Sequence, residues 1–412
     1  IRTRAKQTNR DADGRGCRLV TTATEAVKDG AVQHGLQAHS HGAGVPIQTR
    51  NERMRSTNVA DFPPVTPREE QWRYLPAARL KGLDADYLSE FVGDLEVKHS
   101  DGVTTAWVGS DHPAFGAAGT PEERPSAAAW GSAEQAYLIT LPAEQTSEVQ
   151  IALTSESIEP SALHLIIEAK QFSKASVILD HKGDAILGEN VEIIVGDEAE
   201  LTVISIQDWN EEAVHASTQL AKLGRNAKLK HLVVSLGGET VRVSTSAEFT
   251  APGAEVELLG MYFADSGQHL ENRLFVDHAV ANCKSRVTYK GALQGEQAHT
   301  VWVGDVLIRM AAEGTDTYEL NRNLLLTEGA RADSVPNLEI ETGQIAGAGH
   351  ASASGRFDDE QLFYLMSRGM EQDEAMAMIV RGFVEPIAKE LPMEYSVEMN
   401  RLIELQMEGS IG

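Results

Sequence analysis

One imidazole stands out because of the residues around it. His350 lies in the stretch GAGHASASG, between a predicted strand and a predicted helix. A neutral imidazole can ligate iron or carry a proton near pH 7. The small residues on both sides let the backbone lie close to whatever the segment faces. From the residue alone, a hydrogen-bonded structural histidine is the simpler interpretation, so His350 is a candidate metal site with that alternative beside it.

Thiols are few. The chain has two cysteines, Cys17 and Cys283. Two cysteines cannot form a disulfide framework, which predicts a reducing, cytoplasmic location. Nothing near Cys283 in the sequence would lower its pKa, so a buried structural role is favoured. His39 and His41, in AHSHG, are close enough in sequence to bind a metal ion, although incidental histidines in a tail are the simpler interpretation.

The sequence motifs of common enzymes are missing. We find no GxxxxGK[ST] phosphate-binding loop, no HExxH, no paired CxxC and no GxSxG. Asp277 and His278 are adjacent, so in a strand they would point to opposite faces and could not act as one acid–base pair. The sequence therefore predicts a protein that is not an enzyme and that binds no cofactor tightly by itself.

Charge and hydropathy argue against nucleic-acid-binding and membrane proteins. Lys and Arg number 36 against 61 Asp and Glu, which leaves a formal net charge of -25. Binding to nucleic acid or to an anionic membrane surface needs basic patches, so neither is expected. No apolar run approaches the roughly 18 residues that span a bilayer.

The elements that must position these side chains are short strands. Apolar runs such as AYLITL, NVEIIVG and EVELLGMYF recur every 10 to 15 residues or so through residues 135–345. Many of them alternate apolar and polar residues. This pattern predicts a mainly β core, built as a sandwich, a barrel or a stacked solenoid, and it does not choose among the three.

The regions before and after the predicted β core differ from it in composition and periodicity. Residues 1–19 are basic and lack apolar periodicity, so we expect a non-native or upstream prefix with the natural start at Val20. Residues 20–134 are expected to be a flexible start and an N-terminal helical region that begins near Thr66 and Pro67. Residues 346–412 are expected to be a linker and a C-terminal helical domain. Its apolar residues recur at helical steps and offer a candidate docking face: Met376, Met378, Ile379 and Phe383.

Several segments match a known family in register. HLENRLFVDHAVANCKSRVTYKG, LNRNLLLTEGARADSVPNLEI and the stretch that contains His350 strongly resemble the SufB/SufD family of iron–sulfur cluster assembly proteins. The resemblance covers most of residues 67–400, and it implies a right-handed parallel β-helix for residues 135–345. The matching positions after residue 269 include His278, Cys283, Ser285, Lys290, Gly291 and Gly304.

Within the family, the chain resembles SufD more than SufB. It is short, it contains PREEQWRYLP, and it has Ala348 where many relatives carry a cysteine. This resemblance implies a scaffold subunit that pairs with a SufB-like paralogue and recruits a SufC-like ATPase through the docking face. His350 would then lie at the SufB interface, where an iron–sulfur cluster is held transiently. A homodimer is expected when the chain is isolated.

Two other interpretations stay open at this point. A SufB-like scaffold would nucleate the cluster itself, and a stand-alone parallel β-helix enzyme would act on polysaccharide. The low cysteine count speaks against the first, because cluster ligation usually takes several thiolates. The predicted location and the C-terminal helices speak against the second. The residues leave flavin binding and the stoichiometry of a complex undecided.

Overall fold

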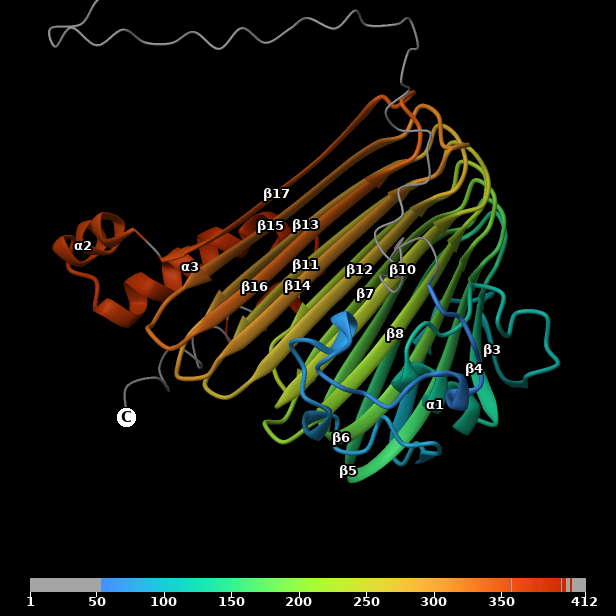
Figure 1. Ribbon diagram of the computed structural model, residues 1–412, viewed down its shortest axis with the longest axis horizontal. Coiled ribbons are helices and arrows are strands. Elements are labelled where there is room, and N and C mark those ends of the chain that lie inside the picture. The colour runs from blue at the N-terminus through green and yellow to red at the C-terminus, as the bar shows by residue number, and fades with distance from the viewer. Residues whose placement is uncertain (1–52, 357, 394, 398–400, 402–412) are drawn as a thin grey trace, which may run out of the picture. The chain divides into compact units, whose positions relative to one another are not determined.

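The computed structural model describes residues 53–356, 358–393, 395–397 and 401. Within this part the chain is mainly β-structure, and its parallel strands stack as the coils of a solenoid (Figure 1). The predicted mainly β, solenoid fold is therefore confirmed. Cys17, His39, His41 and the expected start at Val20 lie outside the described residues.

Two sheets form the walls of the solenoid. The first half of β6 (Lys174–Val195) pairs with β7 and the second half pairs with β8. From there each strand pairs in parallel with the strand two positions later. The odd sheet continues through β7 (Glu200–Trp209), β9 (Lys228–Ser235), β11 (Glu255–Ala264), β13 (Lys284–Leu293), β15 (Asp316–Leu325) and β17 (Gly347–Arg356). The even sheet continues through β8 (Val214–Leu223), β10 (Thr240–Phe249), β12 (His269–His278), β14 (His299–Ile308) and β16 (Arg331–Ile340).

The first coils are less regular. β2 pairs antiparallel with β5, and β3 pairs antiparallel with β4. β4 then pairs in parallel with β5, and β5 with β6, which begins the solenoid. The strands of this part are β1 (Ser89–Glu90), β2 (Asp94–His99), β3 (Thr104–Gly109), β4 (Gln135–Leu141) and β5 (Thr146–Ala169).

Alternating side chains fill the space between the sheets. Inward positions carry aliphatic residues such as Leu229 and Val233 on β9 and Leu274 on β12, all buried in one continuous core. Aromatic residues also lie inside, where glycine makes room for them. A Cβ on Gly291 would collide with the ring of buried Tyr262, so this family-matching glycine is explained by close packing.

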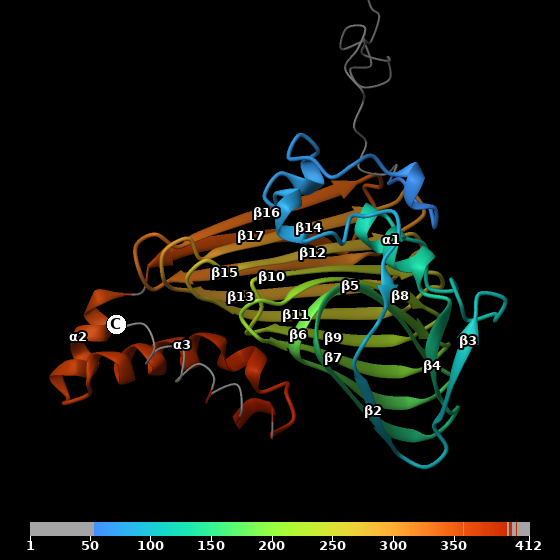
Figure 2. The same cartoon turned by 90° about the horizontal axis from the view of Figure 1, so that it is seen from below.

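Helices and turns cover the outer faces of the two sheets (Figure 2). α3 (Gln372–Ala388) packs against an apolar stripe on the outer face of the odd sheet, which includes Ile204, Leu232 and Leu259. α1 (Arg124–Ser132) and the segment before β1 pack against the first strands of the even sheet, where Trp72 and Leu75 are buried. The burial of apolar surface outside as well as inside the coils stabilises the solenoid.

The structure differs from the expected organisation in two places. The segment that begins near Thr66 contains short 3-10 turns, η1 (Val59–Asp61), η2 (Glu70–Trp72) and η3 (Ala77–Leu80), and no long helix. Pro76 interrupts it, because proline lacks the backbone N–H that a helix needs. In addition, β-structure continues past residue 345, since the expected linker forms β17 in register with β15.

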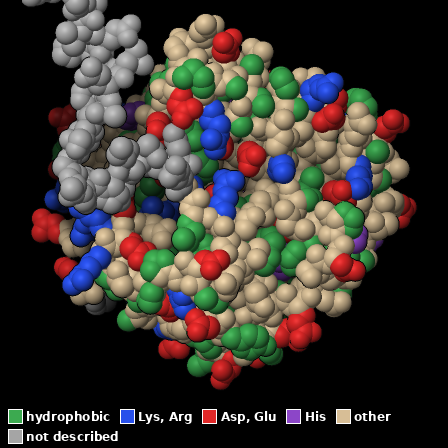
Figure 3. Space-filling model, turned by 45° about the vertical axis from the view of Figure 1, so that its right-hand side comes forward, with side chains coloured by type: hydrophobic (Ala, Val, Ile, Leu, Met, Phe, Trp, Pro, Cys, Tyr) green, Lys and Arg blue, Asp and Glu red, His purple; other side chains and the backbone are tan. Residues whose placement is uncertain are grey.

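On the face drawn in Figure 3, acidic and basic side chains lie interspersed, without one large basic patch. In the described part of the chain, no helix combines the length and the apolar character needed to cross a bilayer.

Candidate functional site at the open end of the solenoid

The last two strands form an open end of the solenoid. β16 pairs with β14 and β17 pairs with β15, and no strand ladder extends beyond them among the described residues. Most side chains of β17 are exposed, and those of β16 are nearly all half-buried. Each strand therefore offers a row of backbone donors and acceptors to a further strand.

His350 lies on this end strand. It is paired in register with Glu319 of β15, so the two side chains project from the same face of the odd sheet, toward the interior. His350 is exposed, and no hydrogen bond or ion pair involves it among the described residues. The alternative interpretation, a structural histidine, would need a hydrogen-bond partner, and no described residue provides one. Ala348 projects from the same face two residues earlier, where it supplies no sulfur.

Glu319 is the unusual neighbour of His350. Its side chain is only 1% exposed, and neither carboxyl oxygen has a hydrogen-bond partner among the described residues. Burial raises the pKa of this carboxyl to about 8, and the charge of nearby Asp305 adds to the effect. The group can therefore hold a proton near neutral pH, as groups at functional sites often do.

The interior beside Glu319 contains further unpaired polar atoms. The indole Nε1 of Trp302 and the hydroxyl group of Tyr289 are buried and have no hydrogen-bond partner among the described residues. Gly304 leaves room here, because a Cβ at this position would collide with Trp302 and with the carboxyl of Glu319. Buried polar groups without partners are costly, so this end of the interior suits water or a polar ligand.

Cys283 lies in a different environment. It precedes β13, is 1% exposed, and has its Sγ 3.6 Å from two backbone carbonyl oxygens, those of Ala251 and Ala281. Burial raises the pKa of the thiol, which disfavours the reactive thiolate. His278 is inward too, bonded to Ser285 Oγ at 2.9 Å, and burial lowers its pKa to about 3. This imidazole is neutral at physiological pH.

Asp277, next to His278, points the other way. It forms a two-pronged ion pair with Arg309 outside the solenoid, with distances of 2.7 and 2.6 Å. The two adjacent residues therefore lie on opposite faces and do not form an acid–base pair. Lys290 bonds the backbone carbonyl oxygen of Phe383 at 2.7 Å and so holds α3 to the odd sheet.

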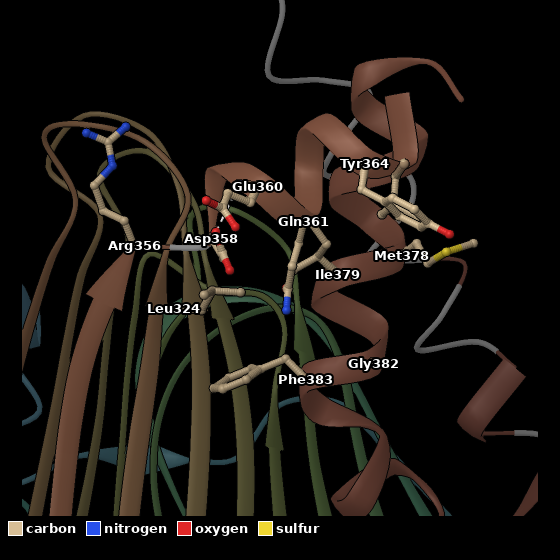
Figure 4. A pocket seen from close by; sticks show the side chains of 11 residues that line it. Leu324, Arg356, Asp358, Glu360, Gln361, Tyr364, Met378, Ile379, Gly382 and Phe383 are labelled. Carbon is tan, nitrogen blue, oxygen red and sulfur yellow. Dashed lines mark hydrogen bonds between the residues drawn. The ribbon is translucent and has the colours of Figure 1, made fainter. Parts of the chain in front are cut away.

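The C-terminal helices form a groove with the end of β15 (Figure 4). α2 (Asp359–Ser367) begins at Asp358, whose carboxylate accepts a bond from the Glu360 N–H, and ends before Gly369, which has φ 92°. The groove has a volume of about 790 Å³. It is lined by Leu324, Arg356, Asp358, Glu360, Gln361, Tyr364, Leu365, Met378, Ile379, Gly382 and Phe383.

The structure divides the candidate docking residues into two groups. Met378, Ile379 and Phe383 line the groove, and Met378 is 43% exposed. Met376 is buried against the odd sheet and does not line the groove. The groove thus contains three of the four candidate docking residues, together with Tyr364 of α2.

Some residues of possible functional importance could not be recognised from the sequence. Glu319 lies within an ordinary strand pattern, and only its register with His350 reveals it. His181, Glu189 and His215 come together inside the solenoid from three separate strand segments. Their common feature is an inward position on β6 or β8, which the sequence shows only once the register of the coils is known.

Known proteins resemble this chain over most of its length. A family model described as "SUF system FeS cluster assembly, SufBD core domain" matches residues 151–383, which begin within β5 and extend through β17 into α3. An iron–sulfur cluster assembly SufBD family protein of Mycobacterium bovis is 46% identical over 385 residues, which cover 91% of this chain and 96% of that protein.

Mycobacterium leprae has two relatives, both named iron–sulfur cluster assembly SufBD family proteins. One is 46% identical over 360 residues, which cover 85% of this chain and 92% of that protein. The other is 37% identical over 232 residues, which cover 56% of this chain and 26% of that protein. The chain is thus similar to one of them over nearly its whole length and to the other over a shared core.

Proposed function

Because the chain belongs to the SufBD family of iron–sulfur cluster assembly proteins, we propose that it is the SufD-like scaffold subunit of a SUF assembly complex. It pairs with a SufB-like paralogue through the open end of the solenoid, and it recruits a SufC-like ATPase through the groove between α2 and α3. The iron–sulfur cluster is its cargo, held transiently between the two scaffold subunits.

The open end carries this proposal. Among the described residues, β16 and β17 present unpaired strand edges beside an exposed imidazole, and strand addition is a common mode of protein association. A paralogue with the same coil geometry could add its own end strands to both edges. Pairing would cover His350 and Glu319 and would place them between two solenoids.

The available ligands favour a SufD-like role over a SufB-like one. Ala348 occupies the position of the late cysteine, and Cys283 is buried. His350 can supply one nitrogen ligand or one proton, but any sulfur ligand must come from the partner. The chain also lacks a phosphate-binding loop, so ATP hydrolysis belongs to another subunit.

The relatives support a pair of scaffolds. Mycobacterium leprae carries two SufBD family proteins that match this chain to different extents. Two paralogues with one core in common can form a heterodimer with approximate twofold symmetry.

The docking groove is the second interface of the proposal. Apolar contact area and adaptable shape come from Tyr364, Met378 and Phe383. The charged lining residues are two acids, Asp358 and Glu360, and one base, Arg356. A helix of the ATPase with apolar and basic residues would suit this groove.

The pairing is tested by adding a charge at the open end. Ser352, exposed on β17, is replaced in Ser352→Lys, and affinity for the SufB-like paralogue is measured by titration of the purified chains. We expect a loss of at least about tenfold, because a buried unpaired charge at an interface is costly. Ser89→Lys, at an exposed position of β1 in the first coil, is the matched control. Equal binding by wild type and Ser352→Lys would place the interface elsewhere.

A further inference from the structure

A second cluster of metal-ligating side chains lies deep inside the solenoid. His181 and Glu189 belong to β6 and His215 belongs to β8, and all three side chains are 0% exposed. One ligand atom from each residue lies within 4.8 Å of the others. The Nε2 atom of His181 is 3.1 Å from Glu189 Oε1, and the Nε2 atom of His215 is 3.4 Å from Glu189 Oε2. We call these three residues the buried triad.

The neighbours of the buried triad determine where the ring protons lie. His181 Nδ1 is 2.9 Å from the carbonyl oxygen of Ile206, which only accepts, so His181 Nδ1 carries a proton. Gln207 Oε1 accepts from the indole N–H of Trp209 at 3.0 Å, which fixes the orientation of the amide. His215 Nδ1 lies 2.6 Å from the same amide oxygen and must therefore donate to it.

Two further contacts do not change this assignment. Gln207 Nε2 is 3.5 Å from His181 Nδ1, which is well beyond the 2.9 Å between this Nδ1 and the Ile206 carbonyl oxygen. The Trp209 indole nitrogen is also 3.2 Å from His215 Nδ1. At the 2.6 Å separation between Nδ1 and the Gln207 oxygen, however, a proton must lie between those two atoms. Both histidines thus use Nδ1 as a donor to an outer acceptor, and both turn Nε2 toward Glu189.

With both ring protons on Nδ1, the Nε2 atoms of His181 and His215 and the carboxylate oxygens of Glu189 are all acceptors, and they face one another. With its proton on Nδ1, neutral His215 presents the Nε2 lone pair to a carboxylate oxygen, and this Nε2 has no hydrogen-bond donor among the described residues. A proton on His181 Nε2 alone would pair this ring with Glu189 at 3.1 Å, but it would leave His215 Nε2 facing the carboxylate without a donor. A proton on each Nε2 would give two buried imidazolium rings, with centroids 5.0 Å apart, against one carboxylate. Such a pair of like charges is unfavourable. A single cation among the three ligand atoms would satisfy both rings and the carboxylate.

We propose that the buried triad binds one divalent transition-metal ion, through His181 Nε2, His215 Nε2 and the carboxylate of Glu189. Two imidazoles and one carboxylate form a ligand set that suits Zn²⁺ or Fe²⁺. The outer hydrogen bonds are those that orient metal ligands: each ring donates Nδ1–H to an oxygen, and Glu189 Oε2 accepts from Ser217 Oγ at 2.7 Å. The ion is structural, and it is distinct from any cluster held at the open end.

Burial determines how the site must be tested. Because the buried triad is inaccessible in the folded chain, an ion enters while the chain folds and then resists removal. The full chain is produced in Zn²⁺-supplemented medium and dialysed against EDTA in the folded state, and its metal content is measured by mass spectrometry. We expect about one Zn²⁺ per chain for the wild type. We also expect its release after denaturation in EDTA, and a higher melting temperature when the chain is refolded with Zn²⁺ than without it.

Variants locate the ion. Glu189→Gln and His215→Gln keep similar size and should each lower the retained Zn²⁺ at least tenfold or so. His231→Gln is the control: His231 is equally buried, on β9, but lies outside the buried triad, so the metal content should be unchanged. His350→Ala should also retain the ion, which separates this site from the proposed function. Equal Zn²⁺ retention by wild type and Glu189→Gln would overturn the proposal.

A second measurement covers the case in which the variants fail to fold. X-ray absorption at the zinc edge of the wild type should show only nitrogen and oxygen ligands at about 2.0–2.1 Å. A sulfur ligand would assign the ion to a cysteine site and contradict the proposal. Wild type that retains no metal after folding with Zn²⁺, and whose melting temperature does not respond to Zn²⁺ during refolding, would also contradict it, whatever the variants do.

Discussion

At the scale of single residues, the open end combines an exposed base with a buried acid. His350 is accessible and unpaired among the described residues, whereas Glu319 beside it is buried with a raised pKa. The two residues therefore call for different tests. The role of His350 is expected to show in cluster assembly, and that of Glu319 in the pH dependence of stability.

His350→Ala should leave folding and pairing nearly unchanged, because the side chain is exposed in the single chain. Cluster formation by the reconstituted complex should fall about tenfold or more if the imidazole is a ligand. His350→Cys should retain part of the activity in the case of metal ligation and none in the case of proton transfer. The measurement is cluster yield, with the melting temperature followed in parallel. A loss of stability in proportion to the loss of yield would show a structural histidine.

Glu319 predicts a pH effect on stability. Its folded pKa of about 8 lies above the usual carboxyl value, so the folded chain keeps a proton that the unfolded chain loses. Stability is full below about pH 4.3 and falls as the pH rises toward 8, with a slope of up to about 1.4 kcal/mol per pH unit. Glu319→Gln should remove this decline and be more stable than wild type at pH 8.

Denaturant unfolding between pH 5 and 9 checks the prediction. Glu296→Gln is a control outside the interior, since Glu296 is an exposed residue in the turn before β14. Parallel pH profiles for wild type and Glu319→Gln would show that the buried carboxyl is already ionised in the folded chain.

At the scale of elements, α3 has two apolar faces with different uses. The face with Met376 and Val380 covers the odd sheet, whereas Met378 projects from the other side of the helix and lines the groove. A truncation after Gly355 would remove the proposed docking site but would also uncover the apolar stripe around Ile204 and Leu232. Exposed apolar stripes promote aggregation, so a point substitution in the groove is the sharper test.

Met378→Asp should weaken binding of the SufC-like ATPase by at least about tenfold, because a carboxylate would be buried without a partner. The fold should be preserved, since Met378 is already 43% exposed. Binding is measured by titration of the purified ATPase. Met393→Asp is the matched control, because Met393 is 84% exposed and does not line the groove. An equal effect of both substitutions would argue against the groove.

At the scale of the whole molecule, the isolated chain should hold no stable iron–sulfur cluster. The described part contains one thiol, Cys283, which is buried. Protein-held clusters usually need several thiolates. Anaerobic reconstitution of the single chain should therefore give no persistent visible absorption, whereas the complex with the SufB-like paralogue should give it. A stoichiometric, chelator-resistant cluster on the isolated chain would contradict the scaffold role.

Much of the architecture could be predicted from the sequence alone. Evenly spaced apolar runs with alternating polarity are local features, and they indicated a β core before any contact was known. The motif around His350 and the absence of a phosphate-binding loop likewise depend on adjacent residues only. These are short-range properties, so the sequence by itself determined the mainly β class, and the in-register motifs indicated the family.

Tertiary structure decided everything that depends on register between coils. Strand pairing placed Glu319 beside His350, which are 31 positions apart, and brought His181, Glu189 and His215 together inside the solenoid. It also turned Gly347–Arg356 into an end strand and buried Met376 while leaving Met378 exposed. A shift of one residue would reverse which side chains face inward, and that choice is made by packing across the whole core rather than by any local pattern.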